Sequence, residues 1–130
     1  MSKKLKQGAE LFLIGSVGYS IIEILWRGFT HWTMSITGGV CFLAIFRINT
    51  KYADEPWWKR CVACSWAVTA VEFLVGCVVN LGLGWNVWSY ERLPLNLLGQ
   101  ICPLFSVLWF FLAIPLQGLT RGLQRRYQTA

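Results

Sequence analysis

Four long apolar stretches set the strongest limit on what this chain can fold into. They cover residues 10–26, 33–48, 61–83 and 97–117. A helix needs about 20 apolar residues to cross the roughly 30 Å hydrocarbon core of a bilayer. A soluble domain of 130 residues has no core large enough to hide four helices that are hydrophobic all round. We therefore predict an all-α, polytopic membrane protein in which residues 1–130 form a single membrane domain with four transmembrane helices.

The twelve lysines and arginines predict how these helices are oriented. Arg27 and Arg92 lie in the first and third connections, whereas the other basic residues lie near the termini or the middle connection: Lys3, Lys4, Lys6, Arg47, Lys51, Lys59, Arg60, Arg121, Arg125 and Arg126. Basic residues accumulate on the cytoplasmic side of membrane proteins, so we expect both termini in the cytoplasm. The expected location is the bacterial cytoplasmic (inner) membrane. Because these side chains meet anionic lipid head groups, the net charge of +6 indicates no nucleic-acid partner.

Two carboxylates fall inside the predicted spans. Ionisable groups are expensive in hydrocarbon, so Glu23 and Glu72 are functional candidates by default. Arg27 follows Glu23 at the spacing of an intrahelical ion pair. Arg27 therefore either neutralises that acid or recognises an anion at the mouth of a cavity. Glu72 has no basic residue one turn away on its own helix, which leaves a structural hydrogen bond or a substrate or proton site.

Small and polar residues form stripes at helical spacing beside these acids. The stripe of the third span contains Cys61, Ser65, Thr69, Glu72, Gly76 and Asn80. Asn96 directly precedes the fourth span, and Gln100 lies in its first turn. Such stripes are typical of helix interfaces, but they also predict a polar cavity that opens outward beneath a cap loop at residues 84–96. The candidate solute- or ion-binding residues are Glu23, Arg27, Glu72, Asn80, Tyr90, Asn96 and Gln100, and a possible gate consists of His31, Trp88 and Arg92.

The sequence contains no pattern that indicates a catalytic centre. It has no Ser-His-Asp or Cys-His constellation, phosphate-binding loop or dinucleotide-binding glycine pattern. Cys61 and Cys64 form a C-x-x-C without further ligands at metal-binding spacing, so we interpret them as reduced packing residues. We expect no catalytic residue, metal or cofactor.

Two motifs resemble a known family. One consists of EILWRGF at residues 23–29 with the glycine pair at 38–39; the other consists of WSY at 88–90, NLLGQIC at 96–102 and Trp109. Together they are similar to the patterns of the bacterial Putative ABC-transporter type IV permease-like family of small membrane proteins. Ser89 stands where that pattern has aspartate. The resemblance implies transport and places one outer constellation at Glu23, Arg27, Trp88, Tyr90, Asn96 and Gln100.

The leading interpretation is a small transport protein, a permease-like subunit or channel, with an outward-facing polar pocket. Its partners would be the lipid bilayer, a small solute, ion or lipid head group, and further copies of the chain, because four short helices enclose little alone. The alternatives are a structural or regulatory membrane subunit and an outer-leaflet lipid-modifying enzyme. A water-filled cavity that reaches Glu72 would favour transport, a sealed dry network the structural subunit, and an acyl-chain groove beside the carboxylates the enzyme.

Overall fold

The computed structural model describes residues 2–28, 30–85, 87–89, 92 and 94–129. Over these residues the chain forms four α-helices, α1 (Lys3–Arg27), α2 (Trp32–Lys51), α3 (Trp57–Gly76) and α4 (Pro103–Thr129). A π-helical segment, η1 (Cys77–Gly82), continues α3. All four helices are long and apolar enough to cross a membrane, the third together with η1. The predicted all-α architecture with four membrane-spanning helices is confirmed.

The fourth helix differs from the predicted span at both ends. It begins at Pro103 rather than at residue 97, because Leu95, Leu98 and Gly99 adopt positive φ angles that an α-helix cannot contain. It then continues to Thr129, past the point where basic residues end the apolar run. Long basic side chains can extend from a helix towards the membrane surface, so their charges do not require the helix to stop.

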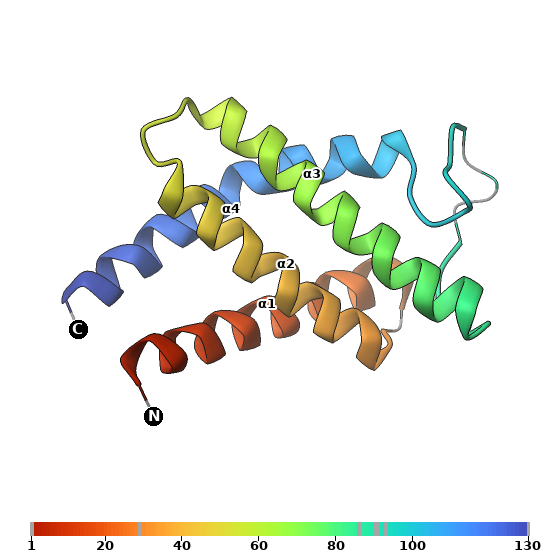
Figure 1. Cartoon of the computed structure of the whole chain (residues 1–130), viewed down its shortest axis with the longest axis horizontal. Helices are drawn as coiled ribbons and strands as arrows, with labels where there is room; N and C mark the ends of the chain where they lie inside the picture. The colour runs from red at the N-terminus through yellow and green to blue at the C-terminus, as the bar shows by residue number, and fades with distance from the viewer. Residues whose placement is uncertain (1, 29, 86, 90–91, 93, 130) are drawn as a thin grey trace.

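The connections alternate between the two ends of the bundle. Figure 1 shows both termini and the connection from α2 to α3 at one end, and the connection from α1 to α2 and the segment between η1 and α4 at the other. The end with both termini is the one that the distribution of basic residues predicts to be cytoplasmic. That assignment stays a prediction.

Glycines allow α1 and α2 to pack closely. A Cβ atom on Gly15 would collide with Phe42 and with the backbone of Gly38. One on Gly38 would collide with Tyr19, and one on Gly39 with Phe12. Small residues let the backbones of membrane helices approach and gain dispersion contacts. The two helices therefore form a tight hairpin in which larger residues at these glycines would not fit.

Polar contacts join α4 to α3 and α2. Ser65 donates its hydroxyl to the carbonyl oxygen of Ser106 at 2.6 Å, and the hydroxyls of Thr69 and Ser106 lie 2.8 Å apart. Near the end with both termini, the Asn49 amide donates to the Thr120 hydroxyl at 3.0 Å. At Ser65 and Thr69, the polar stripe of the third span therefore belongs to a helix interface.

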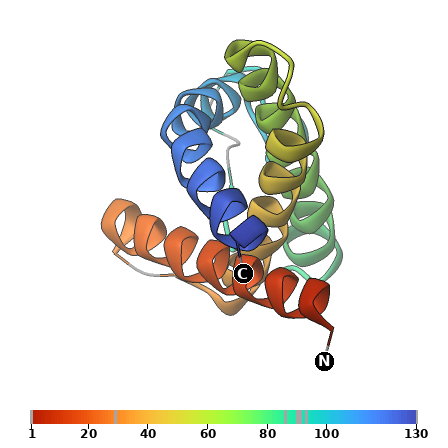
Figure 2. The same cartoon turned by 90° about the vertical axis from the view of Figure 1, so that its left-hand side faces the viewer.

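α1 and α4 meet at one end and separate towards the other. Leu11 and Leu123 pack in one buried cluster, and Glu10 pairs with Arg126 at 2.8 Å. Figure 2, viewed from the end with the termini, shows α1 crossing α4 near the C-terminus and then diverging from it. Residues of both helices line a cavity between them, and we call this space the α1–α4 cleft.

Candidate functional site

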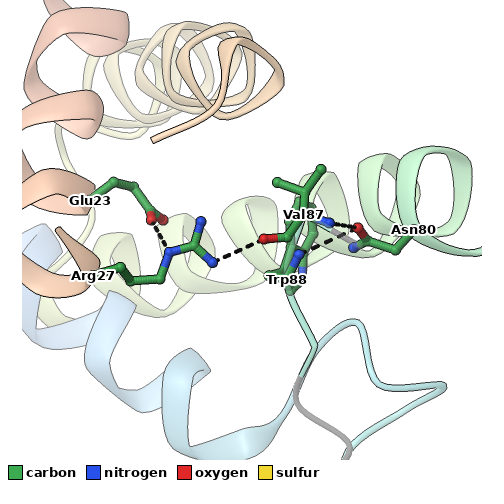
Figure 3. Close-up of polar contacts among 5 residues, drawn as sticks. All are labelled: Glu23, Arg27, Asn80, Val87 and Trp88. Carbon is green, nitrogen blue, oxygen red and sulfur yellow. Dashed lines mark hydrogen bonds and ion pairs between the residues drawn. The ribbon is translucent and has the colours of Figure 1, made fainter. Parts of the chain in front are cut away.

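The last turn of α1 places an ion pair at the wide end of the α1–α4 cleft. The Arg27 Nε and Glu23 Oε2 atoms lie 2.8 Å apart, and their side chains are 22% and 14% exposed. Gly28 ends the helix with a left-handed φ of 83°, and the positive charge of Arg27 is favourable beside the negative end of the helix dipole. Arg27 Nη1 also donates to the carbonyl oxygen of Val87 at 3.0 Å (Figure 3). The predicted ion pair is thus present and is tied to the segment between η1 and α4 (residues 83–102), which we call the outer segment.

Asn80 holds the same outer segment from the opposite side. Its Oδ1 atom accepts hydrogen bonds from the backbone nitrogens of Val87 at 2.6 Å and Trp88 at 3.4 Å (Figure 3). Asn80 lies in η1, where the Leu83 N–H donates to the Val78 carbonyl five residues earlier. A π turn holds more residues than an α turn, so it shifts later side chains around the helix axis. Because Arg27 bonds to Val87 and Asn80 bonds to both Val87 and Trp88, these two residues lie between α1 and η1.

Gln100 completes this hydrogen-bonded group. Its Oε1 accepts from Asn80 Nδ2 at 2.8 Å, its Nε2 donates to the Leu98 carbonyl at 2.8 Å, and its own carbonyl accepts from the Trp88 indole at 3.0 Å. Gln100 is only 3% exposed. A Cβ atom on Gly76 would meet both Gln100 and Trp88, so a glycine is required for this close packing. We call Asn80, Val87, Trp88 and Gln100 the anchoring network.

A cavity of about 430 Å³ lies beside the ion pair, and we call it the outer pocket. Its lining includes three polar or charged residues, Glu23, Arg27 and Ser89, and also Trp88 of the anchoring network. The remaining lining residues are mostly apolar or aromatic: Tyr19, Ile22, Met34, Phe105, Leu108, Trp109 and Leu112. The pocket can therefore accommodate a polar group at one place and apolar surface elsewhere.

The structure brings some of the predicted site residues together and separates others. Glu23, Arg27 and Trp88 line the outer pocket, and Asn80 and Gln100 support it from behind. Glu72 is 3% exposed within α3 and does not line this pocket. The wall is also more apolar than the predicted polar pocket.

The other predicted residues include three more that the structure describes, at the end of the bundle opposite the termini. Asn96 accepts a hydrogen bond from the Gly99 nitrogen at 3.0 Å and so shapes the turn before α4. His31 caps α2, with its Nδ1 atom 3.2 Å from the Thr33 nitrogen, and its ring packs against two tryptophans. Arg92 is exposed. Tyr90 lies outside the described residues.

Sequence reasoning missed the apolar wall of the pocket. Tyr19 and Trp109 stack with 5.8 Å between their ring centroids and contribute to that wall from α1 and α4. The position of Tyr19 one turn before Glu23 was an available signal, because residues at i and i+4 share a helix face. The sequence contains no comparable signal for Leu108 and Phe105. Whether these residues face α1 depends on how the helices cross.

The cysteines do not form a metal centre in the part of the chain that the structure describes. Within that part, no group of three or more His, Cys, Asp or Glu residues is placed to hold a metal ion. Cys61 and Cys64 are free and buried, and the Gln117 amide lies 3.0 Å from the Cys61 sulfur. Their location fits a role in packing between α3 and α4.

Comparison with known proteins identifies the match at the level of a family. A family model described as Putative ABC-transporter type IV matches residues 11–126, which is most of the chain. Searches of curated proteins and of solved structures found no match. The matched region includes α2, α3 and η1, most of α1 and α4, the ion pair and the anchoring network.

Proposed function

The chain belongs to the Putative ABC-transporter type IV family, and from that premise we propose that it is a small transport protein, a permease-like subunit or channel of the bacterial inner membrane. The observation that carries this proposal is the outer pocket. It combines a partly exposed ion pair with a cavity of about 430 Å³. Binding sites for small molecules are typically concave, mostly apolar and equipped with a few polar groups that fix orientation.

The lining of the outer pocket favours an amphipathic solute. A polar group of the solute would lie against Glu23 and Arg27, and its apolar part would pack against Leu108, Phe105 and Trp109. The ion pair is neutral as a unit, so a solute group without net charge would leave no uncompensated charge in a poorly solvated place. The sequence predicts only a small solute, ion or lipid head group. The apolar lining favours, among these, a solute with a substantial apolar surface.

Translocation of a labelled amphiphile tests the proposal. The protein would be reconstituted into vesicles with lysophosphatidylcholine that carries an NBD fluorophore on its chain. External dithionite reduces the fluorophore in the outer leaflet, so translocation appears as loss of the protected fluorescence. Leu108→Trp fills the outer pocket and should slow translocation. The matched control is Leu104→Trp on the same helix, because Leu104 is exposed and does not line this pocket.

Two results would contradict transport through the outer pocket. One is a rate for the wild-type protein equal to that of protein-free vesicles. The other is an equal loss of translocation in Leu108→Trp and Leu104→Trp. That result would mean that any added indole on α4 slows translocation, whether or not it fills the pocket.

The second candidate is a lipid-modifying enzyme of the outer leaflet. A specific observation favours it, because the apolar residues of the pocket wall line the same cavity as Glu23 and Ser89. Such an enzyme would change the head group of its substrate, whereas a transporter returns it intact. Mass spectrometry of the lipid recovered from the same vesicles separates the two functions. An unchanged mass supports transport, and a new head-group mass supports the enzyme.

A structural or regulatory subunit is the remaining candidate, and the anchoring network favours it. Asn80 and Gln100 are buried and bond to backbone groups and to each other. Under our proposal these two residues position the outer segment over the pocket and do not touch the solute. If the network were the whole function, Leu108→Trp would leave the cellular role of the protein intact.

We also propose that the protein forms a homo-oligomer through α4. Gly118 and Gly122 are spaced as in the G-x-x-x-G motif, and a Cβ atom on either would meet no other group. That spacing allows close approach of two membrane helices. Replacing both glycines by leucine should lower the oligomer fraction measured by cross-linking in vesicles, and an unchanged fraction would exclude this face.

A further inference from the structure

A second cavity continues the outer pocket deeper into the α1–α4 cleft. It has a volume of about 140 Å³ and shares four lining residues with the outer pocket: Tyr19, Ile22, Trp109 and Leu112. We call it the inner chamber. All four helices contribute to its wall, for example through Gly18 of α1, Phe42 of α2, Val68 of α3 and Leu119 of α4. The two cavities are therefore adjacent parts of one cleft.

An aromatic pair lies where the two cavities meet. Tyr19 and Trp109 face each other across the cleft, with 5.8 Å between their ring centroids and an angle of 26° between the ring planes. Both residues line the outer pocket and the inner chamber. A group that passes from one cavity to the other must therefore move along these two rings.

The inner chamber has the chemistry of a hydrocarbon site. Among the residues that the structure describes, no charged side chain lines it, in contrast to the outer pocket with Glu23 and Arg27. At the end of the bundle with the termini, α1 and α4 meet through Leu11 and Leu123. Burying a polar group without a hydrogen-bond partner is unfavourable. An occupant of this chamber must therefore be apolar, and the closure of the helices limits how far it can extend.

We propose that the cleft binds a single-chain amphiphile with a zwitterionic head group, whose head lies at Glu23 and Arg27 and whose alkyl chain passes the Tyr19 and Trp109 rings into the inner chamber. The inference rests on the proposed function in using the same outer pocket, and it adds the class of solute. The neutral ion pair matches a head group with both charges and no net charge. Along α4, the distance from Leu108 to Leu119 is roughly 16 Å at a rise of 1.5 Å per residue, which suits an extended alkyl chain.

The test compares two glycine substitutions on α1. Gly18 lines the inner chamber and Gly8 does not, and a Cβ atom on either would meet no other group. Gly18→Leu should therefore fill the chamber without disturbing the helix, and Gly8→Leu is the matched control. Leu119→Trp fills the chamber from the opposite side, so it provides a second variant if Gly18→Leu fails to fold.

Native mass spectrometry of the purified protein would count bound lysophosphatidylcholine across a chain series from hexanoyl to palmitoyl. Each buried methylene strengthens binding about fourfold. In the wild type, affinity should rise along the series. In Gly18→Leu and Leu119→Trp, affinity for the long chains should fall more than about tenfold, while hexanoyl binding stays as in the wild type. Gly8→Leu should match the wild type throughout.

The proposal would be overturned if affinity depended on chain length equally in the wild type and in both filled variants. It would also be overturned if the affinity of the wild type did not depend on chain length. The outcome is separable from that of the transport test. If the filled variants lose affinity for long chains but the wild type does not translocate the lipid in vesicles, the binding site is supported and transport is refuted. Translocation without a change in chain-length dependence would keep transport and refute the placement of the chain.

Discussion

Asn80→Ala tests whether the anchoring network fixes the outer segment to the helical bundle. The Asn80 side chain bonds to the Val87 backbone nitrogen at 2.6 Å and to Gln100 Oε1 at 2.8 Å. Its longer contact, to the Trp88 nitrogen at 3.4 Å, contributes little. Alanine removes both strong bonds and leaves the partner atoms on buried residues.

The expected loss follows from those two partners. A buried polar group without a hydrogen bond destabilises a protein by about 1–3 kcal/mol. Hydrogen bonds between membrane helices contribute less, about 0.6 kcal/mol on average, because separated helices also find partners. The Val87 nitrogen belongs to an irregular segment that has no helix to supply a substitute carbonyl. We therefore expect a loss of about 2 kcal/mol, near the lower end of the sum for two buried groups.

The measurement combines global stability with local protection. Unfolding by sodium dodecyl sulfate in mixed micelles gives the free-energy change, and amide hydrogen exchange reports on Val87 and Trp88. Both amides should exchange faster in Asn80→Ala. Val78→Ala is the control, since Val78 lies in η1 near Asn80 and its side chain is exposed, and surface changes of this kind stay within about 0.5 kcal/mol. A loss in Asn80→Ala no larger than in Val78→Ala, with unchanged exchange at Val87, would refute this expectation.

Three further predictions concern orientation and the two intramembrane acids. After replacement of the native cysteines, Asp54→Cys in intact cells should be protected from an impermeant thiol reagent, and Leu95→Cys should react. The reason is that the positive-inside rule places the middle connection in the cytoplasm. Labelling of the Asp54 site alone would show that the orientation is the reverse of the predicted one. Glu23→Gln and Arg27→Gln should each destabilise the bundle in sodium dodecyl sulfate, and the double variant should lose less than the sum, because each single change leaves a partner charge less well compensated; additive losses would mean that the pair contributes nothing. Glu72 is buried and does not line the outer pocket. Glu72→Gln should therefore leave translocation of the NBD lipid unchanged and shift only thermal stability. A loss of translocation at unchanged stability would place Glu72 on the path of the solute.

The sequence predicts those features that depend on local spacing. Four spans follow from the length of the apolar runs, and the Glu23 and Arg27 pair follows from the spacing of one helical turn. Glu72 and Asn80 show where that logic ends. They are predicted on one continuous stripe, but the π turns of η1 change the helical phase between them, and Asn80 bonds to the outer segment.

The walls of the cleft depend on long-range geometry that periodicity does not contain. Tyr19 and Trp109 stack because α1 and α4 cross at a particular place. The same is true of Gln100, whose amide meets Asn80 only because the segment before α4 turns back through residues with positive φ. Sequence spacing indicates that these side chains are candidates for burial in a membrane domain, but it does not indicate which helix they contact.

The glycine contacts between α1 and α2 also bear on how the protein is made. These two helices are synthesised before α3 and α4, and the close contacts at Gly15 and Gly38 favour their early pairing. α4 follows these helices in the chain, so contacts such as Ser65 with Ser106 and Asn49 with Thr120 form only once α4 has been synthesised. Early pairing of α1 with α2 leaves α1 committed to that neighbour when α4 arrives. The order of synthesis thus favours an assembled protein in which the gap beside α1 remains available to a lipid-soluble molecule.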